Sequence, residues 1–226
     1  MLDLEAVEPA FQDTVNQVRA LLLSNRVTPE IFRAKLADIP ATDRDRWLDL
    51  LWAFDEIPED DPELPRGCVP YLPCPVSTVL EAVQRANVTS EDVFVDVGSG
   101  AGRTALLANL LTGAGCIGLE IQPTLVAVAR GRAAWLNLAR TQFVQGDAAE
   151  LPRFIRAGTV FFLYCPFGAD RVTRILDDLE AVARTRQIRI CCVQMPPLER
   201  PWLTQLPSTS ADLDVYRSTW LCNAEP

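Results

Sequence analysis

The feature that most constrains the fold is a short apolar run that ends in an acid and three glycines at alternate positions. Residues 93–102 read Val-Phe-Val-Asp-Val-Gly-Ser-Gly-Ala-Gly. An apolar run of this length is typical of a buried strand in a parallel sheet. The apolar segment 103–111 follows directly and is predicted to be a helix. Strand, glycine turn and helix in this order indicate an α/β protein.

The glycine turn is suited to binding a ligand. Gly98, Gly100 and Gly102 leave the turn without side chains, so a ligand can lie against the backbone. The free N–H groups in the first turn of the following helix point to the same place. This arrangement predicts a site for a nucleotide-type cofactor.

Two further acids follow at a spacing that suits such a site. Glu120 lies in a second predicted strand, residues 117–121, and falls 24 residues after Asp96. An acid at the end of the neighbouring strand can accept hydrogen bonds from both ribose hydroxyls. Asp147 ends a third short strand, residues 143–147, and suits an adenine amine. The pattern Asp-x-Gly-x-Gly-x-Gly differs from the Gly-x-Gly-x-x-Gly of dinucleotide sites, so NAD is the second choice of cofactor.

These residues resemble those of the class I S-adenosylmethionine-dependent methyltransferases. Residues 96–102 are similar to the first motif of that family, Glu120 to its ribose-binding acid, and Gly146 with Asp147 to its adenine-side motif. The resemblance covers residues 70–195. It implies an α/β fold with a doubly wound, mostly parallel, seven-stranded Rossmann-like sheet. It also implies S-adenosyl-L-methionine as cofactor and S-adenosyl-L-homocysteine as product. A doubly wound domain without a cofactor is the alternative.

The resemblance also implies which residues contact the cofactor. The first motif would hold the methionine end, Glu120 the ribose and Asp147 the adenine. The implied cofactor-binding residues are Asp96, Gly98, Ser99, Gly100, Gly102, Glu120, Ile121, Gly146, Asp147, Ala148 and Tyr164.

Length and composition agree with a cytoplasmic enzyme. The 226 residues suffice for one catalytic domain and a modest extension. No apolar run reaches the ~18 residues that span a membrane, and the acidic N-terminus is not typical of a signal peptide. The seven cysteines are scattered without a Cys-x-x-Cys pair, and there is no histidine, so we expect no metal site. Reduced thiols in the cytoplasm are expected.

Nearly all the net negative charge lies near the N-terminus. Residues 1–66 hold 15 acids and 7 bases, whereas residues 67–226 hold 15 acids and 14 bases. An acidic lobe on a balanced domain argues against a nucleic-acid partner, whose phosphates need a basic surface. The lobe can instead steer a cationic substrate, or it is only a solvated surface.

Residues 1–66 are predicted to form a helical lobe and linker, and residues 67–226 the methyltransferase domain. The lobe is expected to lie over the cofactor site. Thr28-Pro29 predicts the start of a second helix, and Thr42 with Asp45 predicts a capping box before a third. Six of the nine residues 55–63 are acidic, which indicates a linker or flexible lip. The first helix is indicated by an apolar stripe of Leu4, Val7, Phe11, Val15, Val18 and Leu22.

The remaining chain alternates between predicted helices and strands. Helices are expected at residues 77–86, 122–138, 148–157 and 169–183, and strands at residues 158–165 and 187–193. Residues 202–206 and 215–220 fit the antiparallel hairpin that closes the sheet in this class. The buried face of the helix at 122–138 is predicted to carry Leu125, Val128 or Ala129, and Trp135.

A proline-rich segment precedes the helix at residues 77–86. Prolines at 70, 73 and 75 force an extended path. Tyr71 with Pro73 and Pro75 is similar to a Tyr-x-Pro-x-Pro stretch in the lysine methyltransferases that modify the ATP synthase c subunit. In the class I fold a segment at this place often passes over the cofactor. The alternative is a rigid connector with a packed tyrosine.

The end of the fourth predicted strand is where an open α/β sheet places its ligands. Here that end reads Leu163-Tyr164-Cys165-Pro166-Phe167. Amine-modifying members of the class often carry Asn/Asp-Pro-Pro-aromatic at this place, and Cys165 departs from that pattern. The departure counts against methylation of adenine or of a glutamine amide. The pattern, together with residues 94–102, is more similar to the histone lysine methyltransferases that are built on this fold and lack a SET domain.

The absence of histidine bears on the acceptor. O-methylation usually needs a base, often histidine, to remove a hydroxyl proton. Lysine methylation needs a neutral amine instead; an apolar slot lowers the pKa of that amine, and a carboxylate raises it. The slot candidates are Tyr71, Tyr164 and Phe167, although each can be an ordinary core aromatic.

We therefore expect methyl transfer to an amine of a cationic protein or small molecule, with a protein lysine favoured. Two alternatives remain open. One is a small-molecule methyltransferase of specialised metabolism, and the other is a non-catalytic methyltransferase-like binding protein.

Overall fold

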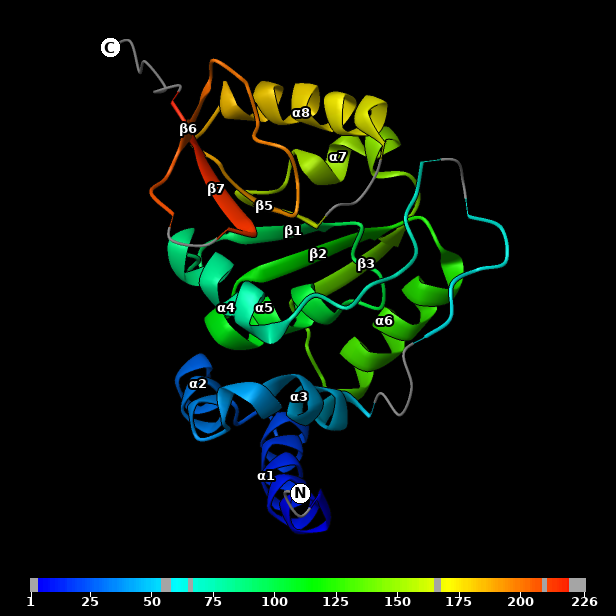
Figure 1. Cartoon of the computed structure of the whole chain (residues 1–226), viewed down its shortest axis with the longest axis vertical. Coiled ribbons are helices and arrows are strands. Elements are labelled where there is room, and N and C mark those ends of the chain that lie inside the picture. Colours follow the sequence, from blue (N-terminus) through cyan, green and yellow to red (C-terminus); the bar gives the residue numbers. More distant parts are fainter. Residues whose placement is uncertain (1–3, 54–57, 65–66, 165–167, 209–210, 220–226) are drawn as a thin grey trace.

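A seven-stranded sheet forms the centre of the molecule (Figure 1). The computed structural model describes residues 4–53, 58–64, 67–164, 168–208 and 211–219. The strand order is β3-β2-β1-β4-β5-β7-β6; β3 to β5 run parallel, and β7 pairs antiparallel with β5 and β6. The predicted doubly wound, mostly parallel sheet with a closing hairpin is confirmed. The strands are β1 (Val93–Val97), β2 (Gly115–Glu120), β3 (Thr141–Gln145), β4 (Val160–Tyr164), β5 (Arg189–Val193), β6 (Leu203–Gln205) and β7 (Leu213–Ser218).

Helices cover both faces of the sheet. One face carries α4 (Val76–Arg85), α5 (Arg103–Thr112) and α6 (Pro123–Trp135), and the other carries α7 (Pro152–Ile155) and α8 (Ala169–Ala183) (Figure 1). Successive strand residues point to opposite faces, so the core divides in two. Phe94 and Phe162 pack on the α5 side, whereas Val95 and Phe161 pack on the α8 side.

Three helices precede this domain: α1 (Leu4–Leu23), α2 (Pro29–Ala37) and α3 (Arg44–Trp52). The apolar stripe of α1 is buried at Phe11, Val15, Val18 and Leu22. Thr28 caps α2 by accepting a hydrogen bond from the backbone N–H of Ile31 at 3.3 Å, and Pro29 is the first helical residue, as predicted.

The predicted capping box at Thr42 is wrong. A 3-10 turn, η1 (Ala41–Asp43), leads into α3, whose N-cap Asp43 makes no side-chain cap. The Asp45 carboxylate instead accepts a hydrogen bond from the backbone N–H of Val76, at the start of α4, at 3.1 Å. Asp45 therefore stabilises the start of α4 and does not cap α3, the helix in which it lies.

The N-terminal helices cover α5, and the expectation that they lie over the cofactor site is wrong. All ten residues of α5 are buried, because the sheet lies on one side and the N-terminal helices on the other. Arg103, at the start of α5, pairs with Asp45 at 2.7 Å and with Asp49, and its guanidinium lies over the ring of Trp52. A buried guanidinium needs such partners. The lobe is therefore anchored beside the glycine turn, on the outer side of α5. The domain boundary at residue 66 stays a prediction.

The predicted burial of Trp135 in α6 is also wrong. Trp135 is 40% exposed, and the guanidinium of Arg19 from α1 lies over its ring, 5.0 Å from the centroid. The buried face of α6 consists of Leu125, Val126, Ala129 and Ala133. Within the described part of the chain, none of the helices has the length and apolar character needed to cross a bilayer.

Candidate active site

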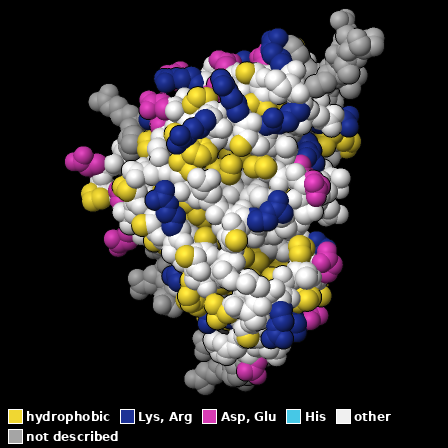
Figure 2. Space-filling view, turned by 180° about the vertical axis from the view of Figure 1, so that it is seen from behind, with side chains coloured by type: hydrophobic (Ala, Val, Ile, Leu, Met, Phe, Trp, Pro, Cys, Tyr) yellow, Lys and Arg dark blue, Asp and Glu magenta, His cyan; other side chains and the backbone are white. Residues whose placement is uncertain are grey.

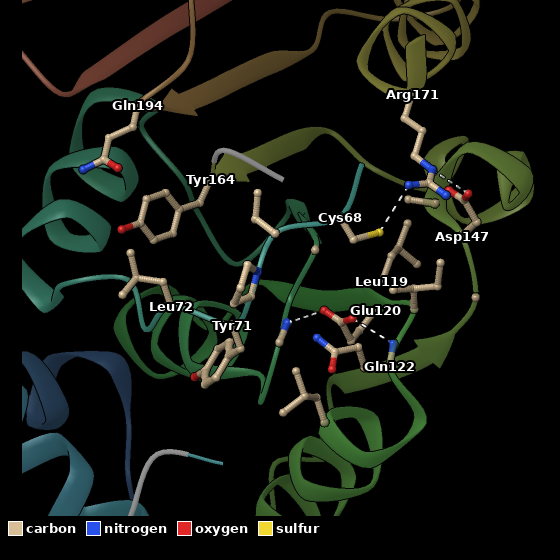
Figure 3. Close-up of a pocket in the computed structure, with 18 residues that line it drawn as sticks. Cys68, Tyr71, Leu72, Leu119, Glu120, Gln122, Asp147, Tyr164, Arg171 and Gln194 are labelled. Carbon is tan, nitrogen blue, oxygen red and sulfur yellow. Dashed lines mark hydrogen bonds and ion pairs between the residues drawn. The ribbon is translucent and has the colours of Figure 1, made fainter. Parts of the chain in front are cut away.

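A cavity of about 420 Å³ opens at the carboxyl ends of the parallel strands (Figure 3). Each strand from β1 to β5 contributes residues at or just after its last position, as expected for an open α/β sheet. The proline-rich segment 68–72 covers it. The lining residues are Cys68, Val69, Pro70, Tyr71, Leu72, Gly98, Gly100, Leu119, Glu120, Ile121, Gln122, Leu125, Gly146, Asp147, Ala148, Tyr164, Arg171 and Gln194.

The glycine turn after β1 has a backbone conformation that favours glycine. Gly98, Gly100 and Gly102 have φ of 78°, 52° and 85°, all in the left-handed region. The turn is tied to β2 because the N–H of Gly98 donates to the carbonyl of Leu119 at 2.8 Å. The ring of Tyr71 packs directly on Gly100, where an added Cβ would lie 2.2 Å from a ring carbon.

Replacing Gly100 by alanine is expected to destabilise the protein by about 1–3 kcal/mol, because the left-handed backbone is strained and the ring of Tyr71 must move. Gly131→Ala is the matched control. Gly131 lies in α6 with nothing within 4 Å of an added Cβ, so this substitution should stabilise by about 0.5–1 kcal/mol. Thermal unfolding of both variants gives the comparison. Equal melting temperatures would contradict the tight packing of Tyr71 on the turn.

Glu120, the last residue of β2, is buried, and its carboxylate joins two backbone segments that line the cavity. One carboxylate oxygen accepts from the N–H of Gly100 at 2.8 Å, and the other from the N–H of Gln122 at 2.8 Å. Burial raises the pKa of Glu120 above its ordinary value, and these N–H groups oppose that rise. Each carboxylate oxygen keeps a second lone pair, so Glu120 can still accept hydrogen bonds from a ligand.

Asp96 lies beneath the turn and lacks a partner for one oxygen. It is 3% exposed, and its Oδ2 has no hydrogen-bond partner among the described residues; the same holds for the hydroxyl of Ser99. Burial, with a smaller contribution from the charge of Glu120, raises the pKa of Asp96 to about 8. A buried carboxylate in this state fits a ligand that brings a positive charge.

Three predicted cofactor residues do not line the cavity. Asp96 and Ser99 are buried next to the glycine turn and are not among the lining residues. Gly102 instead allows close packing of α5, since an added Cβ would come within 2.7 Å of Phe143 and 2.9 Å of Ala129. The roles of all the predicted site residues stay predictions at this point.

Asp147 is held by a residue that the sequence did not indicate. One oxygen accepts from the N–H of Ala149 at 3.0 Å, and the other lies 2.9 Å from Nε of Arg171 in α8. Arg171 also reaches the thiol of Cys68 at 3.2 Å. Arg171 thereby joins the covering segment to the adenine-side motif. No local pattern marks Arg171 among the arginines of a helical face, so sequence reasoning missed it.

The described residues of the acidic segment 55–63 make hydrogen bonds to the site. Asp60 accepts hydrogen bonds from the N–H of Tyr71 at 2.9 Å and from the amide of Gln122 at 2.7 Å. The N–H of Asp61 donates to the other end of the same Gln122 amide at 2.7 Å. Gln122 therefore fixes both the acidic segment and the proline-rich segment beside Glu120. Residues 55–57 lie outside the described residues.

Tyr164 and Gln194 lie at the other end of the cavity from Arg171 and Asp147 (Figure 3). Tyr164 ends β4 and is half-buried, and Gln194 follows β5 and is exposed. Leu72, on the covering segment, is 63% exposed beside them. Tyr71 is also half-buried, and its ring packs on the glycine turn. Phe167, the third predicted slot residue, lies outside the described residues.

Comparisons with known proteins point to methyltransferases. Residues 88–160 match a family model described as a methyltransferase domain. An RNA methyltransferase from Salinibacter ruber, solved with S-adenosyl-L-homocysteine, is 26% identical; the match has a TM-score of 0.51 and covers 65% of this chain and 92% of that chain. The putative methyltransferase yhhF from Escherichia coli is 16% identical, with a TM-score of 0.52 and coverage of 69% and 90%. The second match bears on the fold alone. A search of curated proteins gives no significant match.

The sheet has the Rossmann-like methyltransferase fold, and residues 88–160 form a methyltransferase domain within it. Its cofactor is S-adenosyl-L-methionine, and the residues present fit that molecule. The glycine turn leaves backbone open to the cavity, Glu120 has lone pairs to spare, and the unpartnered oxygen of Asp96 suits an ammonium group. Across the described residues, no group of three or more His, Cys, Asp or Glu side chains is arranged to hold a metal ion.

Proposed function

We propose that the protein transfers the methyl group of S-adenosyl-L-methionine to an amine, with a protein lysine as the favoured acceptor. The cofactor supplies an electrophilic methyl group on a sulfonium. Glu120 would accept hydrogen bonds from the ribose hydroxyls, Asp147 would accept one from the adenine amine through its remaining lone pairs, and Asp96 with the glycine turn would hold the methionine end.

The observation that best supports an amine acceptor is that the lining carboxylates lie away from the end of the cavity at Tyr164. The described carboxylates that line the cavity are Glu120 and Asp147, and Figure 3 draws both away from Tyr164, Gln194 and Leu72. The end that would receive the acceptor is therefore aromatic, apolar and amide-bearing. Such a wall favours the neutral form of an amine, because no carboxylate stabilises its charged form there.

Little chemical assistance is needed for this reaction beyond positioning. Methyl transfer is an in-line displacement, which requires the acceptor nitrogen at ~3–3.5 Å from the methyl carbon and water excluded. A lysine with a pKa of ~10.4 costs about 4–5 kcal/mol to deprotonate at pH 7. Desolvation against Tyr164 and Leu72 would lower that pKa and so reduce this cost.

The charge distribution supports a cationic acceptor over a nucleic acid. The net charge of −9 is concentrated in residues 1–66, whereas residues 67–226 hold nearly equal numbers of acids and bases. On the face seen in Figure 2, several basic side chains surround an apolar area on the upper part of the molecule. Nucleic-acid binding relies on clustered basic side chains. The name of the Salinibacter ruber neighbour points the other way, so RNA is retained as an outcome of the test.

The described cysteines support a reducing location. Cys68, Cys74, Cys116, Cys191 and Cys192 are all free thiols, and the last four are buried. Burial raises the pKa of the Cys191 thiol to about 12, which leaves it in the unreactive protonated form. These free thiols support the cytoplasmic location that we propose for the protein.

Radiolabelled methyl transfer into a cell lysate tests the proposed function. The lysate is incubated with the protein and S-adenosylmethionine labelled in its methyl group, then separated into protein, nucleic-acid and small-molecule fractions. We expect label in the protein fraction, recovered as methyl-lysine after acid hydrolysis, and none with the Glu120→Ala variant. Label only in RNA or only in small molecules would overturn the lysine assignment. No transfer to any fraction would favour a non-catalytic binding protein.

A further inference from the structure

We propose that Gln194 binds the acceptor amine, and that with Tyr164 and Leu72 it forms an acceptor subsite for the end of an alkyl amine chain. This inference rests on the proposed function, because it takes the acceptor to be an amine. It adds a residue and a subsite that neither the cofactor motifs nor the comparisons indicate.

The backbone at Gln194 is unusual for its residue type. Gln194 has φ of 50°, in the left-handed region that glycine or asparagine normally occupies. Its N–H donates to the carbonyl of Asp212 at 2.9 Å, which extends the β5–β7 pairing by one bond beyond Val193. A glycine would satisfy this turn without strain. Strained residues of this kind cluster at functional sites, so the glutamine side chain itself is the feature to explain.

The side chain of Gln194 lines the cavity and has no hydrogen-bond partner among the described residues. The strand register explains why it lies next to Tyr164. Tyr164 pairs with Val193, so the residue that follows Val193 leaves the sheet beside the end of β4. Figure 3 draws Gln194, Tyr164 and Leu72 along one side of the cavity. The one described amide at this end is thus available to a ligand.

An amide suits the chemistry of an amine that must be neutral to react. Its carbonyl oxygen can accept one N–H of the amine and leave the nitrogen lone pair directed at the methyl carbon. A carboxylate at the same place would stabilise the ammonium form, which cannot attack. The charged lining groups, Glu120, Asp147 and Arg171, lie away from Gln194, as does Cys68, whereas the titratable group beside Gln194 is the phenol of Tyr164.

The apolar rim of the subsite suits the chain that carries the amine. Leu72 is 63% exposed and Val69 is 47% exposed, and both line the cavity. Exposed apolar side chains that line a cavity can contact the apolar part of a ligand. The methylene groups of a lysine-like chain would cover Leu72 while the amine reaches Gln194.

Two cofactor analogues test the subsite without knowledge of the natural acceptor. In both, nitrogen replaces the sulfonium sulfur of S-adenosylmethionine. One carries a 2-aminoethyl arm, which places an amine where the acceptor nitrogen would lie, and the other carries a propyl arm of matched length. Calorimetric titration of the full chain should show the amine-bearing analogue binding about tenfold more tightly, the value of one good hydrogen bond.

Gln194→Ala should abolish this preference and leave the affinity for the propyl analogue within about twofold. Gln194→Gly should do the same without loss of melting temperature, because glycine relieves the left-handed strain. Gln194→Glu should bind the amine analogue more tightly at pH 7 yet transfer methyl groups more slowly. Gln187→Ala, at the other end of β5 and exposed, is the matched control and should behave as wild type.

The results separate this inference from the proposed function. If Gln194→Ala still bound the amine-bearing analogue about tenfold more tightly than the propyl analogue, the role of Gln194 would be overturned and the proposed function would stand. The same holds if the wild type labels protein lysine but binds both analogues equally. Failure of the wild type to bind either analogue, or S-adenosylmethionine itself, would overturn both the inference and the proposed function.

Discussion

Replacement of Glu120 by alanine is expected to lower the affinity for S-adenosylmethionine at least 100-fold. The carboxylate would make two charged hydrogen bonds to the ribose, and each such bond is worth about 1.5–3 kcal/mol. The same substitution releases the N–H groups of Gly100 and Gln122, which loosens the turn and the anchor of the covering segment. Isothermal titration calorimetry of the variant and the wild type measures the loss.

Two further variants sharpen the Glu120 test. Glu120→Gln keeps the shape and one carbonyl acceptor, so it should lose about tenfold in affinity. Glu91→Ala removes an exposed acid outside the cavity and should bind as wild type. An affinity of Glu120→Ala within threefold of the wild type would show that the ribose lies elsewhere.

Cofactor binding at pH 7 is expected to release about one proton, because Asp96 changes its protonation state. Burial raises the pKa of Asp96 to about 8, so its carboxyl is mostly protonated in the cofactor-free protein at pH 7. An ammonium group beside the unpartnered Oδ2 would favour the ionised form and expel the proton. Calorimetry in buffers of different ionisation enthalpy measures this release, which should vanish in Asp96→Asn.

The raised pKa of Asp96 also determines how the stability of the cofactor-free protein depends on pH. The pKa of Asp96 is higher in the folded protein than its ordinary value of 3.8, so the folded state holds more protons between those two values. The free energy of unfolding should therefore fall as pH rises from about 4 to 8, by up to about 1.4 kcal/mol per pH unit. Asp96→Asn should flatten this slope and be more stable than the wild type at pH 8.

Asp13→Asn, which changes an exposed acid on α1, is the control for Asp96→Asn and should keep the wild-type slope. Identical slopes for the wild type and Asp96→Asn, together with no proton release on binding, would contradict the buried, unpartnered state of Asp96.

The sequence predicts those helices, strands and turns whose defining residues lie close together in the chain. The apolar run at β1, the alternate glycines and the acids at 120 and 147 lie within a few residues of the elements they define. Helix α8 begins and ends where predicted, since its apolar spacing is strong and Gly168 precedes it. Strand boundaries differ by about two residues, as at β3, because terminal residues satisfy both strand and turn patterns.

The contacts that complete the site join segments far apart in the chain. Arg171 pairs with Asp147 across 24 residues, and Gln122 holds Asp60 across 62. Neither contact leaves a local signal, because a polar residue on a helix or after a strand is ordinary in itself. Gln194 is similar, since only the backbone angle distinguishes it from other exposed glutamines.

One missed feature did carry a signal in the sequence. The segment Arg-Thr-Ala-Leu-Leu-Ala-Asn-Leu-Leu-Thr of α5 is apolar on every side. A helix of that kind must be covered on both faces. The N-terminal helices supply the second cover, which is why they pack on α5 and leave the cavity to the proline-rich segment.

Direct titration of the wild-type protein with S-adenosylmethionine, and separately with NAD, tests the central claim most directly. The glycine turn, the braced Glu120 and the unpartnered Asp96 predict saturable binding of one S-adenosylmethionine per chain, competed by S-adenosylhomocysteine, and no binding of NAD. Binding of NAD, or the absence of any heat or thermal stabilisation with S-adenosylmethionine, would contradict the assignment of this cavity.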